Sequence, residues 1–256
     1  MGFLTDATLC IGCKACEVAC KQWNRLPAEP ITTMTGSSYD NTLDLGATTW
    51  RHVAFVEVEN PPTARHGPIA WLMVSDVCKH CVHAGCLEAC PTGAIIRTEF
   101  GSVVIQDDIC NGCGYCVSAC PFGVPQLGSD GGSHKCTLCY DRLQGGLEPA
   151  CAKSCPTDSI QFGPVADLQV LARQRVETLV ANGVDGARLY GDETLGGTNG
   201  IGGLNAMFIL TAPPETYNLP AAPRLPQTKV IPAFLSTAVA ALGIGLAAAA
   251  ALRDRS

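Results

Sequence analysis

Four groups of cysteines are the residues of this chain with the clearest chemistry. All sixteen cysteines belong to a quartet that opens with a C-x2-C pair and closes with a C-x3-C pair. Numbered along the sequence, the quartets are Cys10-Cys13-Cys16-Cys20, Cys78-Cys81-Cys86-Cys90, Cys110-Cys113-Cys116-Cys120 and Cys136-Cys139-Cys151-Cys155. Quartets one and three have the cysteine spacing of bacterial [4Fe–4S] sites, and proline follows the last cysteine of quartets two, three and four. The pattern predicts four [4Fe–4S] clusters, with iron bound through these cysteines, and therefore a protein that conducts electrons.

Two other uses of paired cysteines compete with this prediction. Disulfides stabilise small secreted scaffolds whose spacings vary from pair to pair, whereas one spacing rule is repeated here in every quartet. Structural zinc sites also use C-x2-C pairs, usually separated by a longer stretch. Zinc does not account for three close cysteines and a fourth that precedes proline. Both alternatives explain the sequence less well than iron–sulfur ligation does.

The fourth cysteine of each quartet predicts how the quartets pair. In two-cluster ferredoxins this cysteine ligates the other cluster of the pair. Quartets two and three are close in sequence and form an inner pair, which leaves quartets one and four as an outer pair. The predicted ligand sets are outer site one (Cys10, Cys13, Cys16, Cys155), outer site two (Cys136, Cys139, Cys151, Cys20), inner site one (Cys78, Cys81, Cys86, Cys120) and inner site two (Cys110, Cys113, Cys116, Cys90).

Composition excludes one class of function. The chain has 256 residues, a formal net charge of −6 and no basic tract, so nothing supports nucleic-acid binding. This length allows one or two domains, in which clusters would replace part of the apolar core. The sequence begins Met-Gly-Phe-Leu-Thr-Asp, without the basic and apolar regions of a signal peptide, so we expect none.

The C-terminal sequence predicts a membrane anchor. Residues 233–252 are uncharged and mostly apolar, and their number matches the hydrocarbon core of a bilayer. Only Ser236 and Thr237 are polar, whereas a soluble surface helix would have a polar face. The alternative is an alanine-rich helix that packs on the soluble domain. Arg253 and Arg255 favour a cytoplasmic C-terminus, and hence a cluster domain on the outer face of the membrane.

Two hairpins and a strand are expected around the quartets. Residues 50–58 and 69–74 are rich in β-branched and aromatic residues and predict a hairpin across the turn at Asn60-Pro61-Pro62. A second hairpin, formed by residues 94–97 and 103–105, should join quartets two and three. Residues 159–162 should form a short strand.

The clearest helical pattern outside the C-terminus covers residues 167–182. Asp167 is positioned to cap this helix and Gly183 to end it, and we expect it to pack on the cluster domain. The predicted fold class is α+β, with two interleaved ferredoxin-like units, short β-hairpins and one C-terminal transmembrane helix. The predicted parts are a four-cluster domain (1–165), a helix and extended packing segment (166–228) and the anchor (229–256).

Histidines and lysines beside the cysteines are candidates for a supporting role. Because no quartet lacks a cysteine, no histidine is needed as a ligand. We therefore expect the side chains of His80, His83 and His134 to lie behind the ligands or on the surface. Four lysines either offset the negative charge of the clusters or are solvated, namely Lys14, Lys21, Lys79 and Lys135.

Longer motifs resemble a known family. The stretches CIGCKACEVACKQWN, NGCGYCVSACPFGVP and KCTLCYDRL resemble the iron–sulfur (beta) subunit of membrane-bound respiratory formate dehydrogenases. Later residues, including Met207-Phe208-Ile209-Leu210, resemble it too, so the similarity spans nearly the whole chain. The cysteine motifs alone fit any four-cluster subunit of the molybdopterin oxidoreductase complexes. Related nitrate and dimethyl sulfoxide reductase subunits replace one cysteine of quartet three, which is complete here.

The resemblance implies a non-catalytic electron-transfer subunit without catalytic residues. Its partners would be a catalytic subunit with a molybdenum or tungsten pterin cofactor, and a membrane cytochrome b or other quinone-reducing subunit. The catalytic subunit would carry the export signal and place the complex at the cytoplasmic membrane, with the clusters on the outer (periplasmic) face. The alternatives are the equivalent subunit of a membrane hydrogenase or of a polysulfide or thiosulfate reductase, and a free-standing polyferredoxin. The partner's metal and the final electron acceptor stay open.

Overall fold

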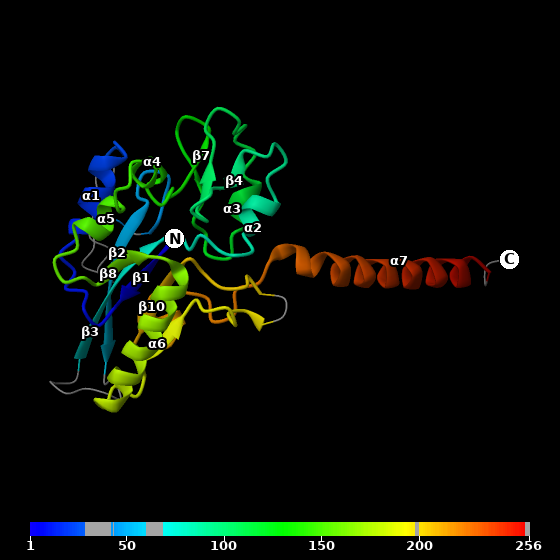
Figure 1. The fold of residues 1–256 in the computed structure, drawn as a ribbon. Helices are drawn as coiled ribbons and strands as arrows, with labels where there is room; N and C mark the ends of the chain where they lie inside the picture. Colours follow the sequence, from blue (N-terminus) through cyan, green and yellow to red (C-terminus); the bar gives the residue numbers. More distant parts are fainter. Residues whose placement is uncertain (29–41, 43, 60–68, 198–199, 254–256) are drawn as a thin grey trace.

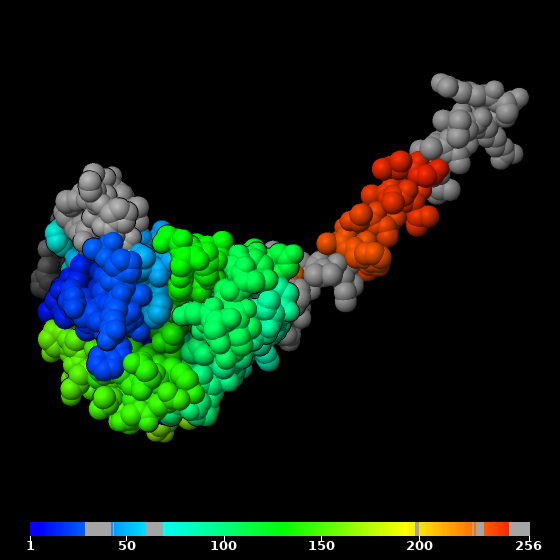
Figure 2. All heavy atoms as spheres, turned by 90° about the horizontal axis from the view of Figure 1, so that it is seen from above, coloured from blue at the N-terminus to red at the C-terminus, as the bar shows by residue number. Residues whose placement is uncertain are grey.

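The computed structural model describes residues 1–28, 42, 44–59, 69–197 and 200–253. Most of them form a body from which one long helix, α7 (Val230–Arg253), projects (Figure 1). The same helix stands clear of the body when the molecule is seen from above (Figure 2). The body is built around one central sheet and a series of short elements that carry the cysteines.

The central sheet has four strands. Their order is β8 (Ile160–Gly163), β1 (Gly2–Asp6), β10 (Ala206–Leu210) and β9 (Arg188–Tyr190). β1 runs parallel to β10, and the other neighbours are antiparallel. All residues of β1 and β10 are buried, as expected for central strands that are covered on both faces. Of these strands only β8 was predicted from the sequence.

Helix α6 (Val165–Ala181) packs on this sheet, as the sequence predicted for a helix against the cluster domain. Leu168, Ala172 and Leu179 are buried in one cluster with Leu4 of β1 and Met207 of β10. These helix positions share one face of α6, since their spacings match the helical repeat. The cluster therefore joins α6 to both central strands.

The predicted start of α6 was wrong. The N-cap is Pro164, which makes no side-chain cap, and Asp167 lies within the first turn. Its negative charge there still interacts favourably with the helix dipole. The predicted end was right, since Asn182 is the C-cap and Gly183 follows it with a φ of 81°, a conformation that glycine adopts without strain.

The other strands described in the body pair as three hairpins. β2 (Arg51–Glu59) and β3 (Ile69–Val77) pair along their whole length and confirm the first predicted hairpin, whose turn lies outside the described residues. β4 (Ile95–Arg97) and β5 (Val103–Ile105) confirm the second. A third hairpin, β6 (Gln126–Leu127) with β7 (Ser133–His134), was not predicted, because strands of two residues leave no periodic signal.

Five short helices lie next to the cysteines. They are α1 (Ala15–Trp23), α2 (Gly85–Glu88), α3 (Tyr115–Ala119), α4 (Tyr140–Gln144) and α5 (Ala150–Lys153). The residue before α1, α3 and α4 is left-handed, at Lys14, Gly114 and Cys139. Such turns gather successive backbone N–H groups into a concave surface of the kind that receives anionic iron–sulfur groups.

Two short 3-10 turns, η2 (Pro214–Tyr217) and η3 (Pro226–Lys229), lead the chain to α7. Several apolar side chains of α7 are exposed, among them Phe234, Val239 and Ile244. Figure 1 shows α7 extending away from the body, not folded back onto it. Within the described part of the chain, no helix combines the length and the apolar character that crossing a bilayer requires. The predicted transmembrane helix is therefore not supported by this structure.

Candidate iron–sulfur sites

The first cavity is lined by the four cysteines of outer site one, Cys10, Cys13, Cys16 and Cys155. Three of them come from the loop and first turn of α1, and the fourth follows α5. Packing of α1 against α5 brings the two ends of the cluster-binding sequence together. Ser75 of β3 also lines this cavity, and its Oγ lies 3.2 Å from Cys16 Sγ.

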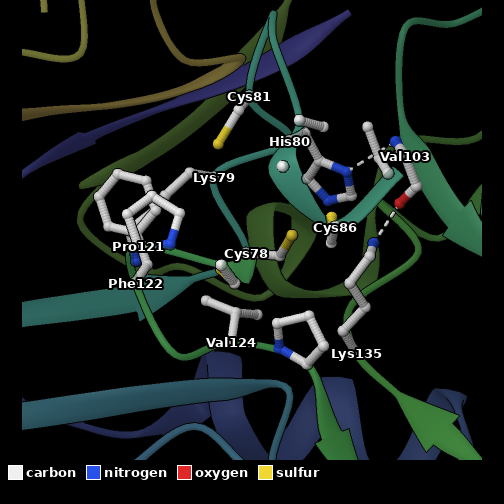
Figure 3. A pocket seen from close by; sticks show the side chains of 14 residues that line it. Cys78, Lys79, His80, Cys81, Cys86, Val103, Pro121, Phe122, Val124 and Lys135 are labelled. Atoms are coloured by element: carbon white, nitrogen blue, oxygen red, sulfur yellow. Dashed lines mark hydrogen bonds between the residues drawn. The ribbon is translucent and has the colours of Figure 1, made fainter. Parts of the chain in front are cut away.

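A second cavity is lined by the cysteines of inner site one, Cys78, Cys81, Cys86 and Cys120. The first two follow β3, the third lies in α2, and the fourth follows α3. Figure 3 shows the sulfur atoms of Cys78, Cys81 and Cys86 around one common space. Contact between α2 and α3 brings the second and third quartets together here.

A third cavity is lined by the cysteines of inner site two, Cys90, Cys110, Cys113 and Cys116. Its surroundings repeat those of outer site one. Ser133 of β7 lines the cavity, and its Oγ lies 3.2 Å from Cys116 Sγ. In both sites a serine on a β-strand therefore contacts the third cysteine of a quartet.

The cysteines of outer site two interact with one another in the interior. Cys20, Cys136, Cys139 and Cys151 are all buried. Burial, and then the charges of Cys151 and Cys139, raise the pKa of the Cys20 thiol. Burial, and then the charge of Cys20, raises the pKa of Cys136. Cys136 and Cys151 also share one buried cluster, and α1, which carries Cys20, packs against α5, which carries Cys151. These contacts fit the predicted ligand set of outer site two.

The packing of the cysteines indicates that the four sites form a row. Cys16, Cys151, Cys136 and Cys78 share one buried cluster, and Cys86 and Cys116 share another. Between successive sites the thiolate of one cysteine helps to raise the pKa of the next, in the pairs Cys16 with Cys151, Cys136 with Cys78, and Cys86 with Cys116. The row therefore runs from outer site one through outer site two and inner site one to inner site two. The two exposed cysteines, Cys13 and Cys113, belong to the sites at its two ends.

Burial disfavours the charged thiolate form of several of these cysteines. It raises the pKa of Cys16 to about 11, that of Cys139 to about 11 and that of Cys86 to about 12. The thiolate is the form that ligates metal, so binding must release the proton. Assembly of the sites is therefore linked to deprotonation of buried cysteines.

The cysteines surround each cavity and do not meet at one point. Among the described residues, no three histidine, cysteine, aspartate or glutamate side chains are arranged to hold a single metal ion. A [4Fe–4S] cluster instead takes one cysteine at each of its four irons, so its ligands face a volume. Four thiols around each of three cavities fit that requirement.

Three buried cations lie among the sites: Arg51, Lys79 and Lys135. Lys79 pairs with Asp76, and Lys135 donates to the backbone carbonyl of Val103. Both lysines line inner site one, and their burial excludes the solvated positions left open by the sequence. Arg51 was missed, because an arginine at the start of a strand gives no sequence signal that separates it from a surface residue.

Two buried side chains have nitrogen atoms without partners. Arg51 Nε and Nη2 and His80 Nε2 form no hydrogen bond within the described residues. His80 Nδ1 accepts the backbone N–H of Val103 at 3.0 Å, which leaves the ring proton on Nε2 (Figure 3). Burial, helped by the charges of Lys135 and Arg97, lowers the pKa of His80 well below its ordinary value. Iron–sulfur clusters would provide sulfur acceptors for these N–H groups. The unpaired nitrogen atoms therefore fit the presence of clusters.

The remaining candidates contact protein atoms or solvent away from the cavities. His83 is exposed, and His134 Nε2 contacts the Asp130 carboxylate at 2.8 Å. Lys21 donates to a backbone carbonyl at 2.9 Å. Lys14 is the exception, because it lines the cavity of outer site one while it pairs with Glu17 at 3.4 Å. The expectation that histidines lie behind the ligands or on the surface agrees with these positions and with the burial of His80.

The fold and the cysteine sites define an iron–sulfur electron-transfer protein built from two dicluster domains. Family models described as 4Fe-4S dicluster domains match residues 9–94 and 69–165, and with sixteen cysteines they correspond to four [4Fe–4S] clusters, as predicted. The matched ranges follow the order of the sequence, whereas the cavities combine cysteines from quartets one and four and from two and three.

Relatives identify the family. The formate dehydrogenase iron–sulfur subunit of Haemophilus influenzae is 40% identical over 247 residues, which cover 94% of this chain and 75% of that protein. The nitrate-inducible formate dehydrogenase iron–sulfur subunit of Escherichia coli is 44% identical over 87% of this chain and 73% of that protein. A component of the anaerobic dimethyl sulfoxide reductase of Escherichia coli is 36% identical over 66% of this chain and 75% of its own length. The chain belongs to the formate dehydrogenase iron–sulfur subunits, and the resemblance seen in its sequence is confirmed.

Proposed function

We propose that this chain carries electrons released from formate by a molybdopterin catalytic partner toward a partner that reduces quinone. The row of four cysteine sites within one body carries the proposal. The clusters would supply one-electron chemistry, and the protein holds their positions and excludes water from most of the ligands. No bond to formate is made or broken on this chain, so the molybdenum or tungsten pterin belongs to the partner.

The four predicted ligand sets are part of this proposal. The cavities that group the cysteines of outer site one, inner site one and inner site two support three of them. The mutual charge effects among Cys20, Cys136, Cys139 and Cys151 support outer site two. Every set takes its last ligand from another quartet, as in two-cluster ferredoxins.

We propose that electrons enter and leave at the two ends of the row. Cys13 and Cys113 are the exposed ligands, and each lies near an exposed apolar residue, Ile11 at 59% and Tyr115 at 60% exposure. Partner subunits that cover such residues would bring their own redox groups close to the terminal sites. Because α7 leaves the body beside the lobe that contains α2, α3 and β4, inner site two is the proposed exit (Figure 1).

The membrane association of the chain is a further part of the proposal. Exposed apolar side chains on α7, and its separation from the body, support a helix that is covered by lipid or by membrane-embedded partners. We propose a single-pass anchor with the cluster body on the outer (periplasmic) face, next to a cytochrome b or other quinone-reducing subunit. Alkaline carbonate extraction of membranes tests this: the full chain should stay in the pellet, and a chain ended after residue 228 should be released.

Deletion of this chain from the native complex tests the function. The catalytic partner alone should still reduce an artificial dye with formate, whereas formate-dependent quinone reduction should be lost. Quinone reduction that survives the deletion would contradict the proposed electron path. Co-purification of a large subunit with a nickel–iron site would favour the hydrogenase alternative.

A further inference from the structure

Arg51 is an arginine without access to solvent, only 1% exposed, at the first position of β2. Its guanidinium lies over the ring of Phe3, 4.8 Å from the ring centre. In the sheet register Arg51 stands opposite Val77, the residue before Cys78. The side chain therefore packs against the central strand β1 and lies in the part of the interior where the cysteine sites meet.

One side of the guanidinium is linked to outer site one. Arg51 Nη1 donates to Ser75 Oγ at 2.9 Å and to the Ser75 carbonyl at 3.3 Å. Ser75 Oγ lies 3.2 Å from Cys16 Sγ. Since Ser75 Oγ accepts from Arg51, its own hydroxyl hydrogen is available to Cys16. The contacts form a chain of hydrogen bonds from the guanidinium to a ligand sulfur.

The guanidinium also lies close to outer site two. Phe3, the ring that it covers, belongs to the same buried cluster as Cys136 and Cys151, two cysteines predicted for that site. Burial lowers the pKa of Arg51, but thiolates at Cys151, Cys16, Cys136 and Cys20, the form that binds iron, outweigh it and raise that pKa. The guanidinium is therefore an electrostatic neighbour of both outer sites.

The guanidinium also keeps unused donors. Nε and Nη2 have no hydrogen-bond partner among the described residues. A buried cation with unpaired N–H groups is costly unless anionic acceptors lie next to it. Cluster sulfur is such an acceptor, and hydrogen bonds to sulfur and local charge are two of the factors that set cluster potentials.

We propose that Arg51 is a positioning and tuning residue that raises the reduction potentials of the two outer clusters together. The inference rests on the cluster assignment of the proposed function. Each reduction adds one electron, and so one negative charge, to a cluster, and a fixed positive charge next to it stabilises the reduced form. Ser75 extends this effect to outer site one through Cys16. Arg51 thereby favours residence of electrons on the two clusters at the entry end of the row.

Redox titration of the purified complex, followed by electron paramagnetic resonance, tests the proposal. A chemical reductant and mediators set the potential, so the result does not depend on formate as the donor. Signals are assigned to outer and inner sites with Cys13→Ser and Cys113→Ser variants. Arg51→Gln removes the charge, Arg51→Lys keeps it, and Arg173→Gln on the exposed surface of α6 is the matched control, since that side chain is 49% exposed.

Arg51→Gln should shift the reduction potentials of both outer clusters to more negative values and those of the inner clusters by a smaller amount. In Arg51→Lys the outer potentials should stay close to those of the unchanged protein. Potentials equal to those of Arg173→Gln in an iron-replete Arg51→Gln protein would overturn the proposal. So would equal shifts in the Lys and Gln variants. If Arg51→Gln does not retain iron, Ser75→Ala decides: it should lower the potential of outer site one alone, and unchanged potentials would reject the link through Ser75.

Discussion

Cys155 and Cys10 line the same cavity although they lie near opposite ends of the cluster-binding sequence. The packing of α1 on α5 brings them together. As a ligand of the predicted outer site one, Cys155 would complete the cluster that quartet one begins. That cluster would then hold the two ends of the cluster-binding sequence together, in addition to the central sheet.

The pairing of Cys155 with quartet one leads to a first prediction. Cys155→Ala should damage the cluster at outer site one, because the remaining ligands of that site are Cys10, Cys13 and Cys16. Cys20→Ala should instead damage outer site two. Electron paramagnetic resonance of the two variants should show the loss or conversion of different signals. Loss of the same signal in Cys155→Ala and in Cys139→Ala would contradict the cross-ligation.

The second prediction concerns His80. With its Nδ1 occupied by the Val103 N–H, His80 can donate only from Nε2, and it lines inner site one. His80→Leu should move the potential of that cluster to a more negative value, because a donor to sulfur is lost. His80→Gln, which keeps an N–H donor, should shift it less. The exposed His83 provides the control, and a shift of the same size in His83→Leu would show that the effect is not local.

A third prediction uses two glycines with similar backbone conformations. Gly112 and Gly123 have φ values of 70° and 64°, so alanine at either position costs about 1–2 kcal/mol in strain. A Cβ at Gly112 would also overlap the carbonyl oxygen of Gly131, whereas a Cβ at Gly123 meets nothing within 4 Å. Gly112→Ala should therefore lower iron content and thermal stability more than Gly123→Ala. Equal losses in the two variants would mean that the approach of Gly131 to quartet three is not important.

The fourth prediction tests the docking of α6. Leu179 is buried in the cluster that α6 shares with β1 and β10, whereas Leu171 is 41% exposed. Leu179→Ala should reduce the stability of the body by about 2–5 kcal/mol, and Leu171→Ala should change it by less than about 1 kcal/mol. Thermal unfolding under anaerobic conditions measures both. A similar midpoint for the two variants would argue against tight packing of α6 on the sheet.

The grouping of the cysteines could be predicted from local spacing. The C-x2-C pairs and the cross-ligation rule gave the sets that line three cavities, and the binding of clusters by these sets stays a prediction. Two of the hairpins were also predictable, since β2 and β3 and then β4 and β5 are runs rich in β-branched and aromatic residues. In each hairpin only a short stretch of sequence separates the two strands.

Other features depend on contacts between distant segments. β1 and β10 pair in parallel across most of the sequence, and no local pattern indicates which strand joins which. The continuous apolar run of β10 was a usable signal for a buried strand, although it did not lead to a prediction. Arg51 could not be assigned to the sites, because its burial follows from packing against Phe3 and Ser75. The proline at the start of α6 took the capping position that the sequence had suggested for Asp167.

Reduction of this chain's clusters by formate in the intact complex tests the proposed electron path most directly. The anaerobic complex should first be shown to contain about sixteen iron atoms per chain, since each of four clusters holds four. Formate is then added without mediators, and the reduced clusters are counted by electron paramagnetic resonance before and after dithionite. We expect formate to reduce clusters on this chain, and Cys13→Ala to prevent this reduction while dithionite still reduces the inner sites. Clusters that dithionite reduces but formate leaves oxidised in the wild-type complex would contradict it.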